Sequence, residues 1–148
     1  MRSRGLLCAV TFALALAANA PPVLAGDEAE NFSVRGWVSV TVPAGFTGRQ
    51  TGGSIVIDQD GGLRTPLQIQ LVRGRFASVL RGKTRQTKTG PATYDIRKRE
   101  TGGSGGPEWR LRIDHPLATV LAVRQNELGP PDFTIVWEVV NSIRTVED

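Results

Sequence analysis

The sequence Gly102-Gly103-Ser104-Gly105-Gly106 has the Gly-x-Ser-x-Gly spacing that carries the nucleophilic serine of many hydrolases. In those enzymes the serine lies on a sharp turn from a strand into a helix, and an acid and a histidine follow along the chain. Here residues 108–114 alternate between polar and apolar types, which predicts a strand. The single histidine, His115, directly follows Asp114, so the two cannot be assumed to form a catalytic base and the acid that orients it. We therefore interpret 102–106 as a hairpin loop and predict that the chain is not an enzyme.

Two further patterns resemble nucleotide and ion sites. Gly82-Lys83-Thr84 matches the end of a phosphate-binding loop, but Ala77 stands where that loop needs a glycine. Asp58-Gln59-Asp60-Gly61-Gly62 matches the start of a calcium loop, but Ile69 occupies the position where an EF-hand needs its last carboxylate. A strand-ending turn is the favoured interpretation, and a calcium contact of another kind at a partner interface stays open. We predict no cofactor and no metal site.

The glycine-rich loop is the main binding candidate. Glycine adopts backbone conformations that other residues avoid, and it lets the main chain of a partner approach closely. A carboxylate and a tryptophan follow the loop, and tryptophan often anchors protein interfaces. A flexible turn without a binding role is the alternative. The predicted partner-binding residues are Gly102, Gly103, Ser104, Gly105, Gly106, Glu108 and Trp109.

Residues 1–25 have the layout of a secretory signal peptide. A short basic start precedes an apolar run over 5–20, and Val23-Leu24-Ala25 ends in the small residue that signal peptidases accept. We expect cleavage between Ala25 and Gly26. The working protein is then a single domain over 26–148, located in the periplasm.

The leader is not expected to remain as an anchor. Its apolar run is shorter than the roughly 20 residues that a membrane-spanning helix needs. A lipoprotein would need a cysteine where Asp27 stands. Cleavage also removes Cys8, the only cysteine, so the domain must be stable without a disulfide. We predict no stable membrane anchor.

The charge of the chain is modestly basic and unevenly placed. The formal net charge is +4, and it falls to +2 when Arg2 and Arg4 leave with the leader. This excess is too small to favour nucleic acid as a partner. Residues 73–99 hold nine basic side chains against Asp95 alone. A solvated surface is the simplest interpretation, and a basic face for an acidic partner is the alternative.

The elements follow from hydrophobic periodicity. One helix is predicted over 132–143 with Asp132 as its N-cap, and a short helix over 76–80. Residues 44–48 are predicted as a turn, and 27–31 as a mobile leader. Strands are predicted over 37–42, 54–58, 66–72, 93–99 and 108–114. Residues 117–125 fit a helix or a strand, and their β-branched residues favour a strand. The fold class is therefore α+β, with an antiparallel sheet of about five or six strands packed on a C-terminal helix.

Several short segments resemble a known group of proteins. Val42-Pro43-Ala44-Gly45-Phe46 and the segment 133–144 resemble the opening turn and final helix of Mog1/PsbP-like domains. Pro66-Leu67-Gln68-Ile69 and the segment 102–111 are similar to periplasmic immunity proteins that neutralise type VI secreted muramidase toxins. The resemblance implies an α/β/α sandwich that occupies the active-site groove of a toxin, in some cases with calcium at the interface.

These observations lead to one principal expectation and one alternative. The chain is expected to be a periplasmic, non-enzymatic immunity protein whose partner is a secreted effector enzyme that attacks the cell wall. The alternative is an accessory or assembly factor of a membrane or envelope complex that uses the basic segment 73–99.

Overall fold

Strands dominate the computed structural model, which describes residues 28–60, 67–74, 76, 78–100, 106–125 and 131–147. Within these ranges there are ten strands and one helix. They are β1 Glu30–Ser33, β2 Val38–Val42, β3 Phe46–Thr51, β4 Ser54–Gln59, β5 Leu67–Val72, β6 Lys83–Thr87, β7 Gly90–Glu100, β8 Pro107–Asp114, β9 Thr119–Gln125, α1 Thr134–Ser142 and β10 Arg144–Thr145.

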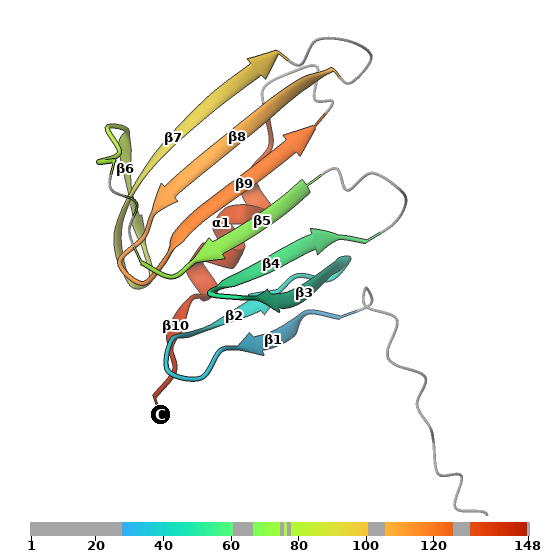
Figure 1. Ribbon diagram of the computed structural model, residues 1–148, viewed down its shortest axis with the longest axis vertical. Helices are drawn as coiled ribbons and strands as arrows, with labels where there is room; N and C mark the ends of the chain where they lie inside the picture. The colour runs from blue at the N-terminus through green and yellow to red at the C-terminus, as the bar shows by residue number, and fades with distance from the viewer. Residues whose placement is uncertain are drawn as a thin grey trace, which may run out of the picture.

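The strands form two antiparallel sheets (Figure 1). The larger sheet has seven strands in the order β3-β4-β5-β9-β8-β7-β6, and the smaller has three in the order β1-β2-β10. The larger sheet consists of two meanders, β3 to β5 and β6 to β9, which join where β5 pairs with β9. The connection from β5 to β6 therefore leaves the middle of the sheet and returns at its edge.

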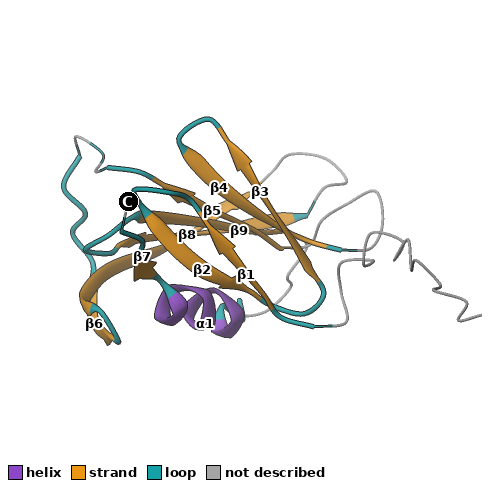
Figure 2. Ribbon diagram, turned by 90° about the horizontal axis from the view of Figure 1, so that it is seen from below, coloured by secondary structure: helices purple, strands orange, loops and turns teal. Residues whose placement is uncertain are grey.

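The core lies on one side of the seven-stranded sheet, where α1 packs (Figure 2). Alternation along β5 sends Leu67, Ile69 and Leu71 to this side, where all three are fully buried. Trp137 of α1 meets the Tyr94 ring of β7 edge to face, with ring centroids 5.0 Å apart. The three-stranded sheet completes the core, and Trp37, directly before β2, donates from Nε1 to the Leu117 carbonyl oxygen at 3.0 Å.

The α+β class is confirmed, but the predicted strand count is too low. Phe46 was assigned to a turn, yet β3 begins there, because its buried ring and pairing with β4 outweigh the local turn residues. β1 lies partly in the segment predicted as a leader, and it pairs with β2. β6 and β10 were missed because one is highly polar and the other has only two residues.

Two predicted helical features differ from the structure. The described residues among 76–80 are not helical. The helix begins at Thr134 with Phe133 as its N-cap, so Asp132 lies one position before the cap. Its Oδ1 accepts hydrogen bonds from the Thr134 backbone N–H and Oγ1, and these bonds lower the pKa of the carboxyl group.

The structure describes a helix on one side of the large sheet and none on the other. The α/β/α sandwich implied by the Mog1/PsbP-like resemblance would need helices on both sides, so membership of that group stays a prediction. The uncovered side, called the open face below, is the surface that faces the viewer in Figure 1.

Candidate functional site

The open face is built from the side chains that alternate away from the core. Strand register places them in rows that cross the sheet. One row consists of Arg49, Val56, Gln70, Leu121, Arg112 and Asp95, and the next of Thr47, Asp58, Gln68, Val123, Arg110 and Arg97. Aliphatic and amide groups thus occupy the centre of the face, and charged groups lie towards its two edges.

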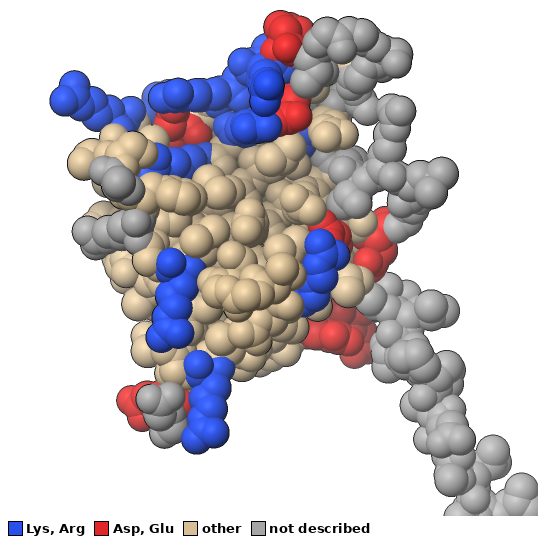
Figure 3. Space-filling model, in the orientation of Figure 1, with Lys and Arg blue, Asp and Glu red and all other residues tan. Residues whose placement is uncertain are grey.

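Figure 3 looks directly onto this face. Lys and Arg side chains gather along its upper edge, over β7 and β8, and a broad uncharged surface lies across the middle. A hollow of about 660 Å³ lies over β5, β9, β8 and β7. Its floor includes Leu121 and Val123, and Val79, Leu80 and Arg81 border it. A volume of this size is typical of binding sites.

Over β7 and β8, the charges of the open face form ion pairs between residues two positions apart on one strand. Period-2 alternation puts such residues on the same side of a sheet. Arg97 Nε lies 2.7 Å from Asp95 Oδ2, and Arg110 pairs with Glu108 in the same way on β8. Three of these side chains are at least a quarter exposed, so solvent weakens the pairs.

One contact across the strands is electrostatically unfavourable. Arg97 and Arg110 are direct cross-strand partners of β7 and β8, so two cationic side chains leave the sheet from opposed positions, and their ion pairs turn them in opposite directions along the strands. Like charges at opposed positions destabilise a sheet. Asp95 and Glu108 each offset one of the two arginines. The arrangement leaves a local site where an additional anion would be favourable.

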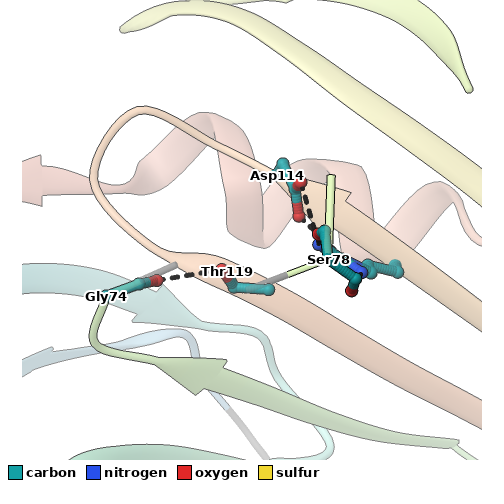
Figure 4. Close-up of polar contacts among 5 residues, drawn as sticks. Gly74, Ser78, Asp114 and Thr119 are labelled. Atoms are coloured by element: carbon teal, nitrogen blue, oxygen red, sulfur yellow. Dashed lines mark hydrogen bonds and ion pairs between the residues drawn. The ribbon is translucent and has the colours of Figure 1, made fainter. Parts of the chain in front are cut away.

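The connection from β5 to β6 is described at residues 73, 74, 76 and 78–82; these residues lie over one end of the open face, and we call them the strap. It contacts β9, β8 and β7 in turn. Thr119 Oγ1 on β9 donates to the Gly74 carbonyl oxygen at 3.0 Å, and Arg112 on β8 donates to Ser78 Oγ at 2.9 Å and to its carbonyl oxygen at 2.8 Å (Figure 4). Arg112 also pairs with Asp114 at 3.0 Å. These bonds fix the described part of the strap on the sheet.

At its far end the strap meets β7 too closely for a side chain. A Cβ atom added to Gly82 would lie 2.0 Å from the Tyr94 carbonyl oxygen. Glycine is therefore required here for steric reasons. Between its fixed ends the strap exposes apolar groups: the side chain of Val79 is 88% exposed and that of Phe76 is 44% exposed.

The structure separates the residues predicted for partner binding. Gly102, Gly103, Ser104 and Gly105 lie outside the described residues, as do Ala25 and Gly26 at the predicted cleavage site. Gly106 has a φ of +68°, a conformation that favours glycine. Glu108 lies on the open face beside Arg110, whereas Trp109 points to the opposite side and packs against the core.

Glu108 and Trp109 therefore cannot contact one flat partner surface together. Only 12% of the Glu108 side chain is exposed, which limits its use as a charged contact. The assignment of the loop as a binding site stays a prediction.

His115 and Asp114 have separate structural partners. The Leu117 backbone N–H donates to His115 Nδ1 at 3.1 Å, so Nε2 carries the proton and donates to Thr89 Oγ1 at 2.6 Å. Burial lowers the pKa of His115. Asp114 instead pairs with Arg112 on the open face. The two residues are adjacent in sequence, but their contacts lie on different parts of the fold.

The carboxylates of the calcium-like segment are also engaged. Asp58 pairs with Arg49 at 2.7 Å, and Asp60 Oδ1 accepts a hydrogen bond from Thr47 at 2.5 Å. Within the described ranges, no three His, Cys, Asp or Glu side chains cluster closely enough to hold a metal ion. Among those same residues, no helix is long and apolar enough to cross a membrane.

The basic segment 73–99 does not form a single face. Arg97 and Arg81 border the hollow on the open face. Arg85 lies on the helix side, with its guanidinium carbon 4.3 Å from the centre of the Trp137 ring. Arg73 donates to the Gly36 carbonyl oxygen. These cations are distributed around the sheet, which weakens the alternative of an envelope factor with one basic face.

Sequence reasoning missed the open face although part of its signal was present. The alternation of Glu108, Arg110, Arg112 and Asp114 places four charges on one side of a strand. The polar positions of 67–72 alternate in the same way. Their convergence depends on the pairing of β5 with β9, which no local pattern indicates.

Comparison with known proteins relates the chain to a protein family. Residues 39–144 match the family model described as "Type six secretion immunity 3 domain". The chain is also similar to "Immune protein Tsi3" of Pseudomonas aeruginosa, at 30% identity over 106 residues. That alignment covers 69% of this chain and 72% of the relative. The residues matched by the family model include the whole seven-stranded sheet, the strap and α1.

Proposed function

The chain belongs to the type six secretion immunity 3 family, and from this membership we propose that it is an immunity protein that binds and inhibits a secreted effector. The match over residues 39–144 is the observation that carries this proposal. It includes every strand of the large sheet, so the open face lies within the family domain. The protein would act by occupying its partner and not by chemistry of its own.

The proposal includes a place and a target. Residues 1–25 have the signal-peptide pattern, which supports action in the periplasm. An effector met in that compartment has the cell wall within reach, and the resemblance of 66–69 and 102–111 to immunity proteins against muramidase toxins supports an effector of that class. Membership of the Mog1/PsbP-like group, which the resemblance of the segments 42–46 and 133–144 supports, is part of the same proposal.

The test is protection of a bacterial host. A muramidase encoded next to the gene for this chain is directed to the host periplasm, and the chain is co-expressed with and without residues 1–25. We expect the full chain to prevent lysis and the leaderless chain to fail. Equal protection by both forms would contradict periplasmic action, and lysis with both, despite soluble protein, would contradict inhibition of this effector.

The glycine-rich loop is tested separately by deleting Gly103, Ser104 and Gly105. If the loop contacts the effector, calorimetric titration should show weaker binding while the thermal unfolding midpoint changes little. Unchanged affinity would remove the loop from the interface without affecting the proposed function.

A further inference from the structure

The paired arginines of the open face are the starting point. Arg97 and Arg110 are direct cross-strand neighbours, and their side chains are 81% and 54% exposed. Their ion pairs turn the two side chains towards Asp95 and Glu108, on opposite sides of the pair, so a carboxylate that approached from solvent would lie between two guanidinium groups. Arginine pairs with carboxylates through two parallel hydrogen bonds, which makes such a position selective for an acid.

An apolar surface lies immediately beside this charged position. Val123 follows Arg110 in the same row of the sheet, and Leu121 lies in the next row. Both line the hollow, together with Val79 of the strap. An isolated valine that is 88% exposed would be unremarkable alone. Here it borders a hollow with an aliphatic floor, so an aliphatic side chain of a partner would bury several apolar groups at once.

The strap holds this surface in a fixed shape. Hydrogen bonds from Thr119 and Arg112 fix Gly74 and Ser78, and the close approach of Gly82 to β7 fixes the far end. Rigid surfaces bind with a smaller loss of conformational entropy than mobile ones. The open face therefore combines an anion position, an apolar hollow and an ordered border.

We propose that the open face binds an acidic, aliphatic segment of the effector, with one carboxylate between Arg97 and Arg110 and an aliphatic side chain in the hollow beside Val79. This inference rests on the proposed function, and it assigns the contact surface to the sheet face instead of the glycine-rich loop. Charge complementarity selects the acidic partner, because four arginines line the hollow and the carboxylates of Asp95, Glu108 and Asp114 offset only three of them.

The experiment uses the effector whose toxicity the chain suppresses in the host assay, titrated into the protein by calorimetry. Arg97→Glu should weaken binding at least tenfold. It replaces repulsion from Arg110 with attraction and the exposed ion pair with Asp95 with repulsion, so the thermal unfolding midpoint should change little. Val79→Asp should also weaken binding at least tenfold, and it should leave stability unchanged because the side chain is exposed.

Arg49→Gln is the matched control. Arg49 is also an exposed arginine of the open face paired with an aspartate, but it lies on β3, which β4 separates from the strands that line the hollow. Its loss should leave affinity unchanged. In a second readout, isotope-labelled methyl groups of Val79, Leu121 and Val123 should shift when the effector is added.

Wild-type binding that persists within twofold in both Arg97→Glu and Val79→Asp would overturn the open-face assignment and leave the proposed function intact. Absence of wild-type binding would overturn both. Methyl shifts confined to α1 would also overturn the assignment. So would a wild-type homodimer that Arg97→Glu dissociates, since the face would then bind a second copy of the chain.

Discussion

At the scale of single residues, His115 is held in its neutral form. Its Nδ1 accepts the Leu117 N–H, so a proton added there would remove this hydrogen bond as well as charge a buried ring. Burial therefore lowers the pKa below its ordinary value of 6.5. Between the two values the unfolded chain binds more protons than the folded protein, so the free energy of unfolding must fall as the pH falls below 6.5.

Urea denaturation between pH 7.5 and pH 5 measures this effect. We expect one histidine to contribute at most about 1.4 kcal/mol per pH unit to the slope of the free energy of unfolding against pH. In His115→Gln, which keeps a polar group but does not titrate, the slope in this window should decrease. An identical slope in both proteins would assign the pH dependence to other groups.

Gly82 is a second residue whose type the structure determines, because its position has no room for a side chain. A Cβ atom at this position meets a backbone carbonyl oxygen, which cannot rotate away as a side chain can. We expect Gly82→Ala to lower the free energy of unfolding by about 1–3 kcal/mol, the usual range for overpacking. Gly53→Ala is the control, because a Cβ there has no heavy atom within 4 Å. Equal stability of the two variants would show that the strap moves away at little cost.

At the scale of elements, Arg112 joins the strap to β8. Arg112→Gln removes its bonds to Ser78 and Asp114, and hydrogen bonds to charged groups contribute about 1.5–3 kcal/mol each. Hydrogen exchange at residues 78–82 should become at least tenfold faster, with the exchange of β9 unchanged. Arg49→Gln removes an equivalent ion pair on β3 and should not affect the strap. Unchanged exchange in Arg112→Gln would mean that other contacts hold the segment.

The elements also show how far the sequence can predict this fold. Alternating segments such as 54–58 and 66–72 are recognisable because each buries one face against a core. β6 is not recognisable, since its first four residues are exposed and its pairing with β7 alone defines it. Ile96 lies opposite Leu111 in a row on the core side, yet it is 40% exposed near the sheet edge, which its apolar side chain does not indicate.

The candidate site was less predictable than the fold because it depends on which strands pair, and the local sequence does not indicate that pairing. The period of β8 places Arg110 on the side opposite Leu111, but it cannot show that Arg97 is the neighbour across the strand. The strap was predicted as a short helix from the spacing of Phe76, Val79 and Leu80. In the structure Val79 is exposed instead of buried, so the apolar spacing reflects a surface feature.

At the scale of the whole molecule, the proposed export makes a direct prediction. Protein recovered from the periplasm should begin at Gly26, as measured by intact mass spectrometry. Ala25→Arg should leave the leader attached, because signal peptidases require a small residue before the cleaved bond. A mature protein that begins elsewhere would correct the boundary, and a protein confined to the cytoplasm would refute the export proposal.

The division of the large sheet into two meanders determines how the chain can acquire its structure. Within each meander the paired strands are close in sequence, so their ladders can form early, whereas β5 and β9 must meet across a long intervening chain. We expect docking at this seam to follow the rate-limiting step. Leu71→Ala should then mainly accelerate unfolding, with a φ-value near zero, whereas Ile113→Val within the second meander should slow folding. A φ-value near one for Leu71 would place the seam in the nucleus, and the strap would then be in place from the earliest stage of folding.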